Sequence, residues 1–249
     1  MLSSQRKQTI LALLAQEKQV QSRELSQRFG LSEDSIRRDL RELAAEGLLQ
    51  RVHGGALPVS AALATFETRK SVQTASKQVI AQKAVSLIQP GQIVLIDGGT
   101  TSAELVRRLP ATLSFTAVTH SPSVALALVD HPLVEIILIG GQLYKHSVVT
   151  VGAAMLESIN RINADLFFMG VTGVHPAAGL TTGNFEEATV KRALAGRAAE
   201  TVVLASAEKL NSASAFAIGD LSLASTLVVE TQPDEALRQA LSQQGVTII

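Results

Sequence analysis

Residues 22–40 read SRELSQRFGLSEDSIRRDL, and this stretch decides how the N-terminal part of the chain folds. Leu25 and Phe29 lie four residues apart, as apolar positions on one helix face do, and Ser22 stands where an N-cap is expected. Gly30 predicts the end of this helix, because a residue without a Cβ tolerates the left-handed conformation found there. A second helix after the glycine turn completes the pattern of a helix-turn-helix.

The second helix of this motif is predicted to present a polar face to DNA. Ser32 can cap it, and the acids at 33–34 suit its first turn because the helix dipole favours negative charge there. Ile36, Leu40 and Leu43 share one face and are expected to point inward. The outward residues that we predict to contact DNA are Ser35, Arg37, Arg38 and Arg41. An arginine offers a planar fork of donors that fits phosphate oxygens or the paired acceptors of a guanine edge.

The flanking sequence supplies the other parts of a winged helix-turn-helix over residues 3–58. Upstream, Ile10, Leu13 and Leu14 form an apolar stripe at helical spacing. Downstream, residues 48–56 predict a short strand, a Gly-Gly turn and a return segment that ends at Pro58, and these would form a wing. The remaining predicted DNA-binding residues are Ser22 and Ser32 at the helix starts, and Arg51 and His53 on the wing.

A simpler interpretation of the arginines is an ordinary solvated helix face, balanced by Asp39 and Glu42. For an isolated charged helix that interpretation would be favoured. Charge does not decide the matter, since residues 1–58 hold nine Lys/Arg against seven Asp/Glu, a net of +2 in a chain of zero net charge. The turn, the buried stripe and the wing together favour DNA binding.

The composition limits the other classes of function. The chain of 249 residues is 46% hydrophobic and 18% charged, so it can build a sizeable core. It has no Cys, which excludes disulfides and thiolate metal sites, and its five His residues show no ligand spacing. We therefore predict no metal and no cofactor. No apolar run approaches the ~18 residues of a membrane helix. A cytoplasmic protein with no membrane partner is expected, located at the nucleoid when bound to DNA.

The rest of the chain predicts an α/β domain. Residues 59–76 are rich in Ala, Ser and Thr and suit a linker, and a helix is expected from about Lys77 to Ile88. Apolar runs then predict strands at 92–97, 114–119, 134–139, 164–169, 201–205, 226–230 and 246–249. Helices are expected at 102–109, 122–129, 153–160, 185–199 and 234–243. Continuous apolar strands separated by helices indicate a mostly parallel sheet covered on both faces, so residues 77–249 form the second predicted domain.

Ligands of such sheets bind at the carboxyl ends of the strands, where three loops carry informative residues. DGGTT at 97–101 joins a strand to a helix, and its glycines, hydroxyls and helix N-terminus suit a phosphate. It has neither the P-loop spacing nor the GxGxxG fingerprint. The alternative is a plain tight turn in which Thr101 or Ser102 caps the helix. The other two loops carry Thr119-His120-Ser121 and Gly140-Gly141.

The chain resembles the DeoR family of bacterial repressors along nearly its whole length. The N-terminal match is carried by Arg6-Lys7-Gln8, Glu24-Leu25, Phe29-Gly30-Leu31-Ser32, Ile36-Arg37-Arg38-Asp39-Leu40, Gly47 and Arg51-Val52-His53-Gly54-Gly55-Ala56. The second part matches through Lys77, Ile80-Ala81, Ala84, Asp97–Thr101, Thr119-His120-Ser121, Leu138-Ile139-Gly140-Gly141, Val151-Gly152, Asp165, Phe168-Met169-Gly170, Gly179-Leu180-Thr181 and Lys209.

The resemblance implies a sensor domain with a fold similar to ribose-5-phosphate isomerase, which binds phosphorylated sugars or related metabolites. The phosphate would lie on Gly99, Thr100 and Thr101, with Lys209 supplying a positive charge. Asp97, Thr119, Ser121 and Thr172 would line the sugar, and Gly98, His120 and Gly141 complete the predicted effector-binding set.

Some positions depart from the family pattern. The family often has Ser at Gly98, Asn at His120 and Asp at Ser206. His120 would change the donors and acceptors in the pocket and so the effector, or it would be a surface residue at a strand end. Lys209 has a second interpretation too, as a solvated lysine after Glu208. Glu186 and Glu187 open a helix, where the dipole favours acids, and are expected to be structural.

Three functions are compatible with these patterns. The main one is a repressor of carbohydrate-metabolism genes that binds double-stranded operator DNA, is controlled by a phosphorylated sugar, and works as at least a dimer, either a dimer or a tetramer. Residues 212–229 are the candidate dimer surface. The second is a sugar-phosphate isomerase or lyase with a DNA-binding head, which the acid-free loop 170–174 argues against. The third is an adaptor that binds a partner protein without sequence-specific contact to DNA.

Overall fold

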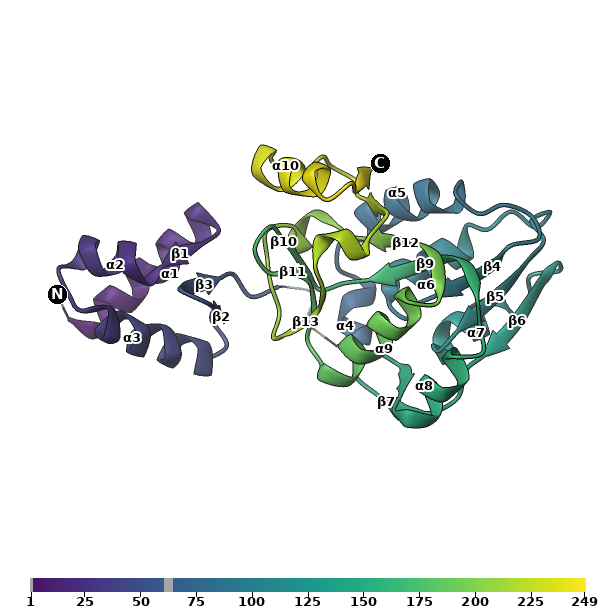
Figure 1. Ribbon diagram of the computed structural model, residues 1–249, viewed down its shortest axis with the longest axis horizontal. Helices are drawn as coiled ribbons and strands as arrows, with labels where there is room; N and C mark the ends of the chain where they lie inside the picture. The colour runs from purple at the N-terminus through teal and green to yellow at the C-terminus, as the bar shows by residue number, and fades with distance from the viewer. Residues whose placement is uncertain (1, 61–64) are drawn as a thin grey trace.

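The computed structural model describes residues 2–60 and 65–249, and Figure 1 shows a small N-terminal part beside a larger α/β part. The small part contains α1 (Ser3–Glu17), β1 (Val20–Gln21), α2 (Ser22–Phe29), α3 (Glu33–Ala45), β2 (Gln50–Val52) and β3 (Gly55–Leu57). Its three strands form an antiparallel sheet in the order β1-β3-β2. This arrangement is a winged helix-turn-helix, as the sequence predicts.

Local signals fix the helices of this domain as expected, with one exception. Gly30 ends α2 in the left-handed conformation at φ 64°, and the side chain of Ser32 accepts the Ser35 N–H at the start of α3. Ile36, Leu40 and Leu43 pack into a core with the stripe of α1. The N-cap of α2 is Gln21 and not Ser22, which is buried in the first turn with its N–H donating to Gly54.

The larger part is built on a seven-stranded parallel sheet in the order β15-β14-β12-β9-β4-β5-β6. Its strands are β4 (Ile93–Ile96), β5 (Phe115–Thr119), β6 (Val134–Leu138), β9 (Ala164–Gly170), β12 (Ala198–Leu204), β14 (Thr226–Val228) and β15 (Thr247–Ile248). Each of the seven predicted strands is one of these, so the prediction of a parallel sheet is confirmed.

Helices cover both faces of this sheet, because its central strands are apolar on both sides. One face packs against α5 (Thr74–Val85), α6 (Thr100–Arg107) and α7 (Pro122–Leu128). The other packs against α8 (Ala153–Ile159), α9 (Phe185–Ala195) and α10 (Glu235–Gln243). The predicted helix 185–199 ends early, because Gly196 closes α9 and the chain enters β12 at Ala198.

Short segments outside the main sheet were not predicted as strands. β7 (Gln142–Tyr144) pairs with β8 (Val149–Val151), while β10 (Gly173–His175), β11 (Gly179–Thr182) and β13 (Phe216–Gly219) form a separate antiparallel sheet. Short helical turns η2 (Ala207–Lys209) and η3 (Leu221–Leu223) flank β13. Nine of the eighteen residues 212–229, the candidate dimer surface, are buried; exposed large apolar side chains include Phe216 within this range and others on α7 and β6.

The segment expected as a linker is partly helical. Within 59–76 the described residues include α4 (Phe66–Lys70) and the first residues of α5, whereas 61–64 lie outside the described residues. Phe66 is buried and its N–H donates to His146 at 3.0 Å. The α4 part of the segment that joins the two parts therefore packs on the larger α/β part. No described helix is long and apolar enough to cross a membrane.

The order of the strands marks where a ligand site is expected. The chain runs from β4 outward to β5 and β6, and then returns to the other side of β4 to build β9, β12, β14 and β15. The strand order therefore reverses between β4 and β9. In open α/β sheets ligands bind at the carboxyl ends of the strands beside this point. Asp97 follows β4 there, and Gly170 ends β9.

Candidate DNA-binding surface and effector cavity

The predicted DNA-reading face of α3 is exposed. Arg37, Arg38 and Arg41 are all solvent-accessible, and Ser35 is half-buried. Arg37 pairs with Glu33 at 2.7 Å and with Asp34 at 3.3 Å, both in the first turn of the same helix. Arg38 makes no hydrogen bond or ion pair within the described residues, so its guanidinium is free to bind a phosphate or a base edge.

Asp39 does not balance the exposed arginines as the solvated-face interpretation requires. It is buried, and Arg6 of α1 grips it through two bonds, from Nε to Oδ2 at 2.5 Å and from Nη2 to Oδ1 at 3.0 Å. The hydrogen bond to Asp39 raises the pKa of Arg6. Asp39 thus anchors α3 to α1. Because its carboxylate is buried, the outward face of α3 carries a more positive net charge than the sequence suggests.

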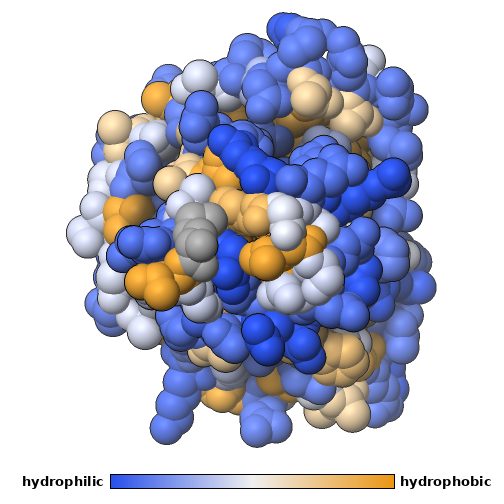
Figure 2. Space-filling view, turned by 90° about the vertical axis from the view of Figure 1, so that its left-hand side faces the viewer, coloured by the Kyte–Doolittle hydropathy of each residue, from blue (hydrophilic) through white to orange (hydrophobic). Residues whose placement is uncertain are grey.

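The other predicted DNA-binding residues divide by exposure. Arg51 on β2 and His53 in the turn between β2 and β3 are exposed, as is Ser32. Ser22 is 3% exposed, so its side chain is not accessible to DNA. Its role is structural, because its N–H donates to Gly54 in the wing. Figure 2 looks onto the end of the molecule that carries this domain and shows a mainly hydrophilic surface with apolar residues in small groups.

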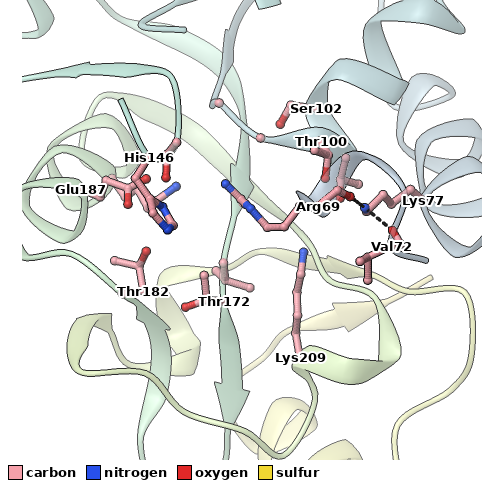
Figure 3. A pocket seen from close by; sticks show the side chains of 18 of the residues that line it. Arg69, Val72, Lys77, Thr100, Ser102, His146, Thr172, Thr182, Glu187 and Lys209 are labelled. Atoms are coloured by element: carbon pink, nitrogen blue, oxygen red, sulfur yellow. Dashed lines mark hydrogen bonds between the residues drawn. The ribbon is translucent and has the colours of Figure 1, made fainter. Parts of the chain in front are cut away.

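A cavity of about 290 Å³ lies at the carboxyl ends of the central strands, at the reversal point of the sheet. Figure 3 shows that its side chains converge from several elements, with Thr100 and Ser102 on one side and Lys209 and Thr172 facing them. The cavity is lined by Arg69, Val72, Lys77, Gly98, Gly99, Thr100, Thr101, Ser102, Tyr144, His146, Ser147, Gly170, Val171, Thr172, Thr182, Gly183, Glu187, Lys191, Glu208 and Lys209.

One wall of the cavity is an anion cradle at the N-terminus of α6. Gly99 is the N-cap at φ 125°, a conformation that favours glycine, and the first helical bond runs from Ala103 N–H to Gly99. The N–H groups of residues 100–102 precede that bond and lack helical partners. The hydroxyls of Thr100, Thr101 and Ser102 do not cap the helix, so the alternative of a plain turn capped by Thr101 or Ser102 is wrong. They make no hydrogen bond among the described residues.

Gly98 allows the loop 97–101 to approach the hairpin formed by β7 and β8. A Cβ at Gly98 would lie 2.1 Å from the Cγ1 atom of Val149. The serine that the family often carries here would therefore require Val149 to move in this chain. The cradle and β8 are therefore in close contact here.

Three cationic side chains face the cradle, and each carries a desolvation cost. Lys209 is 8% exposed and makes no side-chain hydrogen bond or ion pair among the described residues. Burial lowers its pKa to about 8, although Glu208 raises it. Burial also lowers the pKa of Lys77 and of Arg69. An anionic ligand would compensate these buried charges, and the solvated interpretation of Lys209 is wrong.

Asp97 anchors a buried ion cluster beneath the cavity and does not line it. Its carboxylate accepts from Lys191, from His120 Nε2 at 2.9 Å, and from the N–H groups of Gly98 and Gly170, each at 2.8 Å. Burial alone would raise the pKa of Asp97, but Lys191 and His120 hold it well below its usual range. With its oxygens occupied by the protein, Asp97 positions the cradle and the end of β9, and the expectation of a sugar contact is corrected.

His120 is neither a pocket residue nor a surface residue. It is 1% exposed, and its Nδ1 faces the main-chain oxygen of Thr150 at 2.9 Å while Nε2 faces Asp97. Both neighbours are oxygens that can accept a hydrogen bond from the ring. His120 therefore ties β5 to β8 and to Asp97, and it does not alter the donors that an effector meets.

Six of the eleven predicted effector residues line the cavity, and five do not. The six are Gly98, Gly99, Thr100, Thr101, Thr172 and Lys209. Besides Asp97 and His120, the other three that lie outside are Thr119, Ser121 and Gly141. Thr119 donates to Ile96 and Ser121 donates to Val148, so their hydroxyls hold strand ends together. Gly141, at φ 157°, packs against Val151 and Met155.

Two acids, Glu187 and Glu208, line the cavity. Glu187 is 7% exposed, and its carboxylate has no hydrogen bond or ion pair among the described residues. Glu208 accepts from Ser206 at 2.6 Å through one oxygen, and its other oxygen is buried without a partner. Glu187 does begin a helix as expected, but its side chain turns into the cavity (Figure 3). No group of three or more potential metal-ligating side chains occurs among the described residues.

Two family matches cover the chain. Residues 6–61 match the DeoR-like helix-turn-helix domain, and residues 72–231 match the DeoR C terminal sensor domain. The chain belongs to the DeoR family. It is a transcriptional regulator with an N-terminal DNA-binding domain and a C-terminal sensor domain, and the cavity described above lies in the DeoR sensor domain.

Curated relatives are similar to this DeoR-family chain over its whole length. HTH-type transcriptional regulator GlpR of Haloferax volcanii is 33% identical over 100% of this chain and 98% of its own. The glycerol-3-phosphate regulon repressor of Escherichia coli is 29% identical over 100% of this chain and 99% of its own. Both names describe regulators of transcription.

Solved structures that resemble part of this chain include ribose 5-phosphate isomerase A of Methanocaldococcus jannaschii. It is 19% identical, with a TM-score of 0.40, and the likeness covers 54% of this chain and 53% of that one.

Proposed function

We propose that this DeoR-family protein represses carbohydrate-metabolism genes and that a phosphorylated sugar or related metabolite in the cavity controls its affinity for operator DNA. The observation that carries the proposal is the pairing of the Gly99–Thr101 cradle with the buried Lys209, which makes no ion pair among the described residues. A helix N-terminus and a desolvated ammonium both favour a dianionic phosphate. The cavity of about 290 Å³ suits a small ligand.

The far side of the cavity supports a hydroxyl-bearing ligand. Thr172 and Thr182 present side-chain oxygens there, and Glu187 offers an unpaired carboxylate as an acceptor for hydroxyl groups. A phosphate at one end and hydroxyls at the other describe a sugar phosphate or a polyol phosphate. The name of the Escherichia coli relative refers to glycerol 3-phosphate, a compound of that class.

The output of the protein is DNA binding through α3 and the wing. Ser35, Arg37, Arg38 and Arg41 would enter the major groove of double-stranded operator DNA, and Arg51 and His53 would contact its backbone or minor groove. Specific binding by a helix-turn-helix needs paired half-sites, so we propose that the protein acts as at least a dimer. It would work in the cytoplasm, bound to the nucleoid.

We do not propose catalysis. The acid-free loop 170–174 argued against an isomerase, but Glu187 supplies a carboxylate to the cavity from another part of the chain, so that argument no longer holds. The curated relatives are named as regulators, which favours a binding role for the cavity. A turnover assay with ribose 5-phosphate and similar sugars tests this directly. Turnover that Glu187→Gln abolishes would show that the cavity is an active site.

A gel shift tests the regulatory proposal. DNA flanking the protein's own gene is titrated with the protein, alone and with each of a panel of sugar phosphates. We expect one or a few compounds to weaken the shift, and the double variant Thr100→Val, Thr101→Val to bind the same DNA but ignore the compound. Loss of DNA binding in that variant without unfolding, or no response to any compound in the wild type, would contradict the proposal.

A further inference from the structure

Arg69 reaches the cavity from a part of the chain that does not belong to the sheet. It lies on α4, which begins at Phe66, nine residues after β3 ends at Leu57. The segment between the DNA-binding domain and α5 therefore supplies one wall of the effector cavity. Figure 3 shows the Arg69 side chain extending across the middle of the cavity, between Thr100 and Lys209 on one side and Glu187 on the other.

The guanidinium of Arg69 is incompletely satisfied. Its Nε is buried and has no hydrogen-bond partner. Burial lowers the pKa of Arg69; the nearby charge of Glu187 acts in the opposite direction, but the two side chains make no ion pair. A buried guanidinium favours an anion that accepts two of its parallel N–H groups, as a phosphate does. Arg69 is thus available for the same anion as the cradle on α6.

The main chain of α4 is held by groups that also line the cavity. Lys77 donates from Nζ to the main-chain oxygens of Arg69, at 2.5 Å, and of Val72. Lys77 is 5% exposed, so its ammonium and the guanidinium of Arg69 are two partly desolvated cations on one wall. Burial, and to a smaller extent the charge of Arg69, lowers the pKa of Lys77, so an anion between the two cations would stabilise this docked arrangement.

We propose that Arg69 couples the effector to the DNA-binding head: an anion in the cradle draws in the guanidinium and fixes α4 against the sensor domain. The inference rests on the proposed function, because it needs an anionic effector in the cavity. The anion compensates Arg69 and Lys77 together, so it binds the docked form of α4 more tightly than the undocked form. A ligand shifts a conformational equilibrium only through such a difference in affinity.

Hydrogen exchange of the full-length protein, with inorganic phosphate as the probe and matched potassium chloride as the blank, tests the coupling. Slower exchange of the amides at 100–102 reports that the cradle is occupied. Slower exchange at 65–72 reports that α4 is fixed. In the wild type we expect phosphate to slow both segments. In Arg69→Gln we expect 100–102 to respond, with phosphate affinity lowered about tenfold, and 65–72 not to respond.

Two further variants keep the result unambiguous. Lys70→Gln changes the exposed neighbour that pairs with Glu67 on the same helix, and it should behave as the wild type does. Arg69→Lys keeps the charge without the planar guanidinium and should give partial protection of 65–72.

Equal protection of 65–72 in Arg69→Gln and the wild type would overturn the inference. Protection of 100–102 alone in the wild type would also overturn it and leave the proposed function intact. No protection at 100–102 would remove both.

Discussion

Arg6 of α1 and Asp39 of α3 form a two-bonded ion pair inside the DNA-binding domain, with Nε 2.5 Å from Oδ2 and Nη2 3.0 Å from Oδ1. Both residues are buried. Asp39 follows directly on Arg38, so the pair fixes the rotation of the DNA-reading helix relative to α1. The ion pair thereby determines which residues of α3 face outward.

Removal of this pair should destabilise the DNA-binding domain. Arg6→Met leaves the Asp39 carboxylate buried without its cation, which costs about 2–3 kcal/mol. Hydrogen exchange of amides in α1 and α3 should then accelerate about 30- to 150-fold, with the sensor domain unchanged. The control is Arg37→Met, which breaks an exposed pair and should change exchange little. Equal effects of the two changes would argue against a structural role for Arg6.

Arg38→Ala should weaken operator binding without affecting stability. Its guanidinium is exposed and makes no internal bond among the described residues, so its loss removes only contacts with DNA. We expect a loss of about 1–3 kcal/mol in binding free energy if it reads a base, measured by fluorescence anisotropy at fixed salt. An unchanged affinity, together with an unchanged affinity for Arg37→Ala, would support the adaptor interpretation instead.

Asp97→Asn should destabilise the sensor domain. The change leaves Lys191 and His120 without their shared carboxylate, a loss of about 3–5 kcal/mol for a buried ion pair. Because the folded pKa of Asp97 lies below its unfolded value of about 3.9, the wild-type contribution is complete above that value and is lost as the pH falls through the folded pKa. Urea titrations at pH 7 and at pH 3 should show a smaller difference between the two proteins at pH 3. A constant difference would contradict the ion cluster.

Lys209 should make effector binding dependent on pH. Its pKa is about 8 in the free protein, and a bound phosphate favours the ammonium form. Affinity for a sugar phosphate should therefore fall as the pH rises above 8, by up to about tenfold per pH unit. The ligand does not contribute, because its second phosphate pKa is near 6. Calorimetry with Lys209→Gln should show weaker binding and a flat profile between pH 7 and 9; a profile parallel to that of the wild type would exclude Lys209 as the titrating group.

The sequence predicts the architecture well because the determining signals are local. Strands such as β4 and β9 are continuous apolar runs, and Gly30 and Ser32 mark helix ends through backbone chemistry that depends only on neighbours. Short strands are harder, because a segment such as Gly179–Thr182 gains its strand form from pairing with β10 and β13. No pattern within four residues contains that information.

The site is predicted only in part, for a related reason. The cradle at 99–101 is a local motif and lies in the cavity as expected. Asp97 lies in the same loop, but its oxygens are taken by Lys191, 94 residues away along the chain, and by His120. Arg69 was missed because its segment has the composition of a linker. Neither relationship is visible before the fold brings the residues together.

The central claim is that operator and effector binding are linked, and reciprocal titration measures that link most directly. The operator fragment found by gel shift is titrated with and without the effector, and the effector is titrated with and without the operator. We predict that each ligand weakens the other by the same factor, about 5- to 150-fold, since a coupling free energy is shared by both sites. Independent binding, with a factor of one in both directions, would contradict the account.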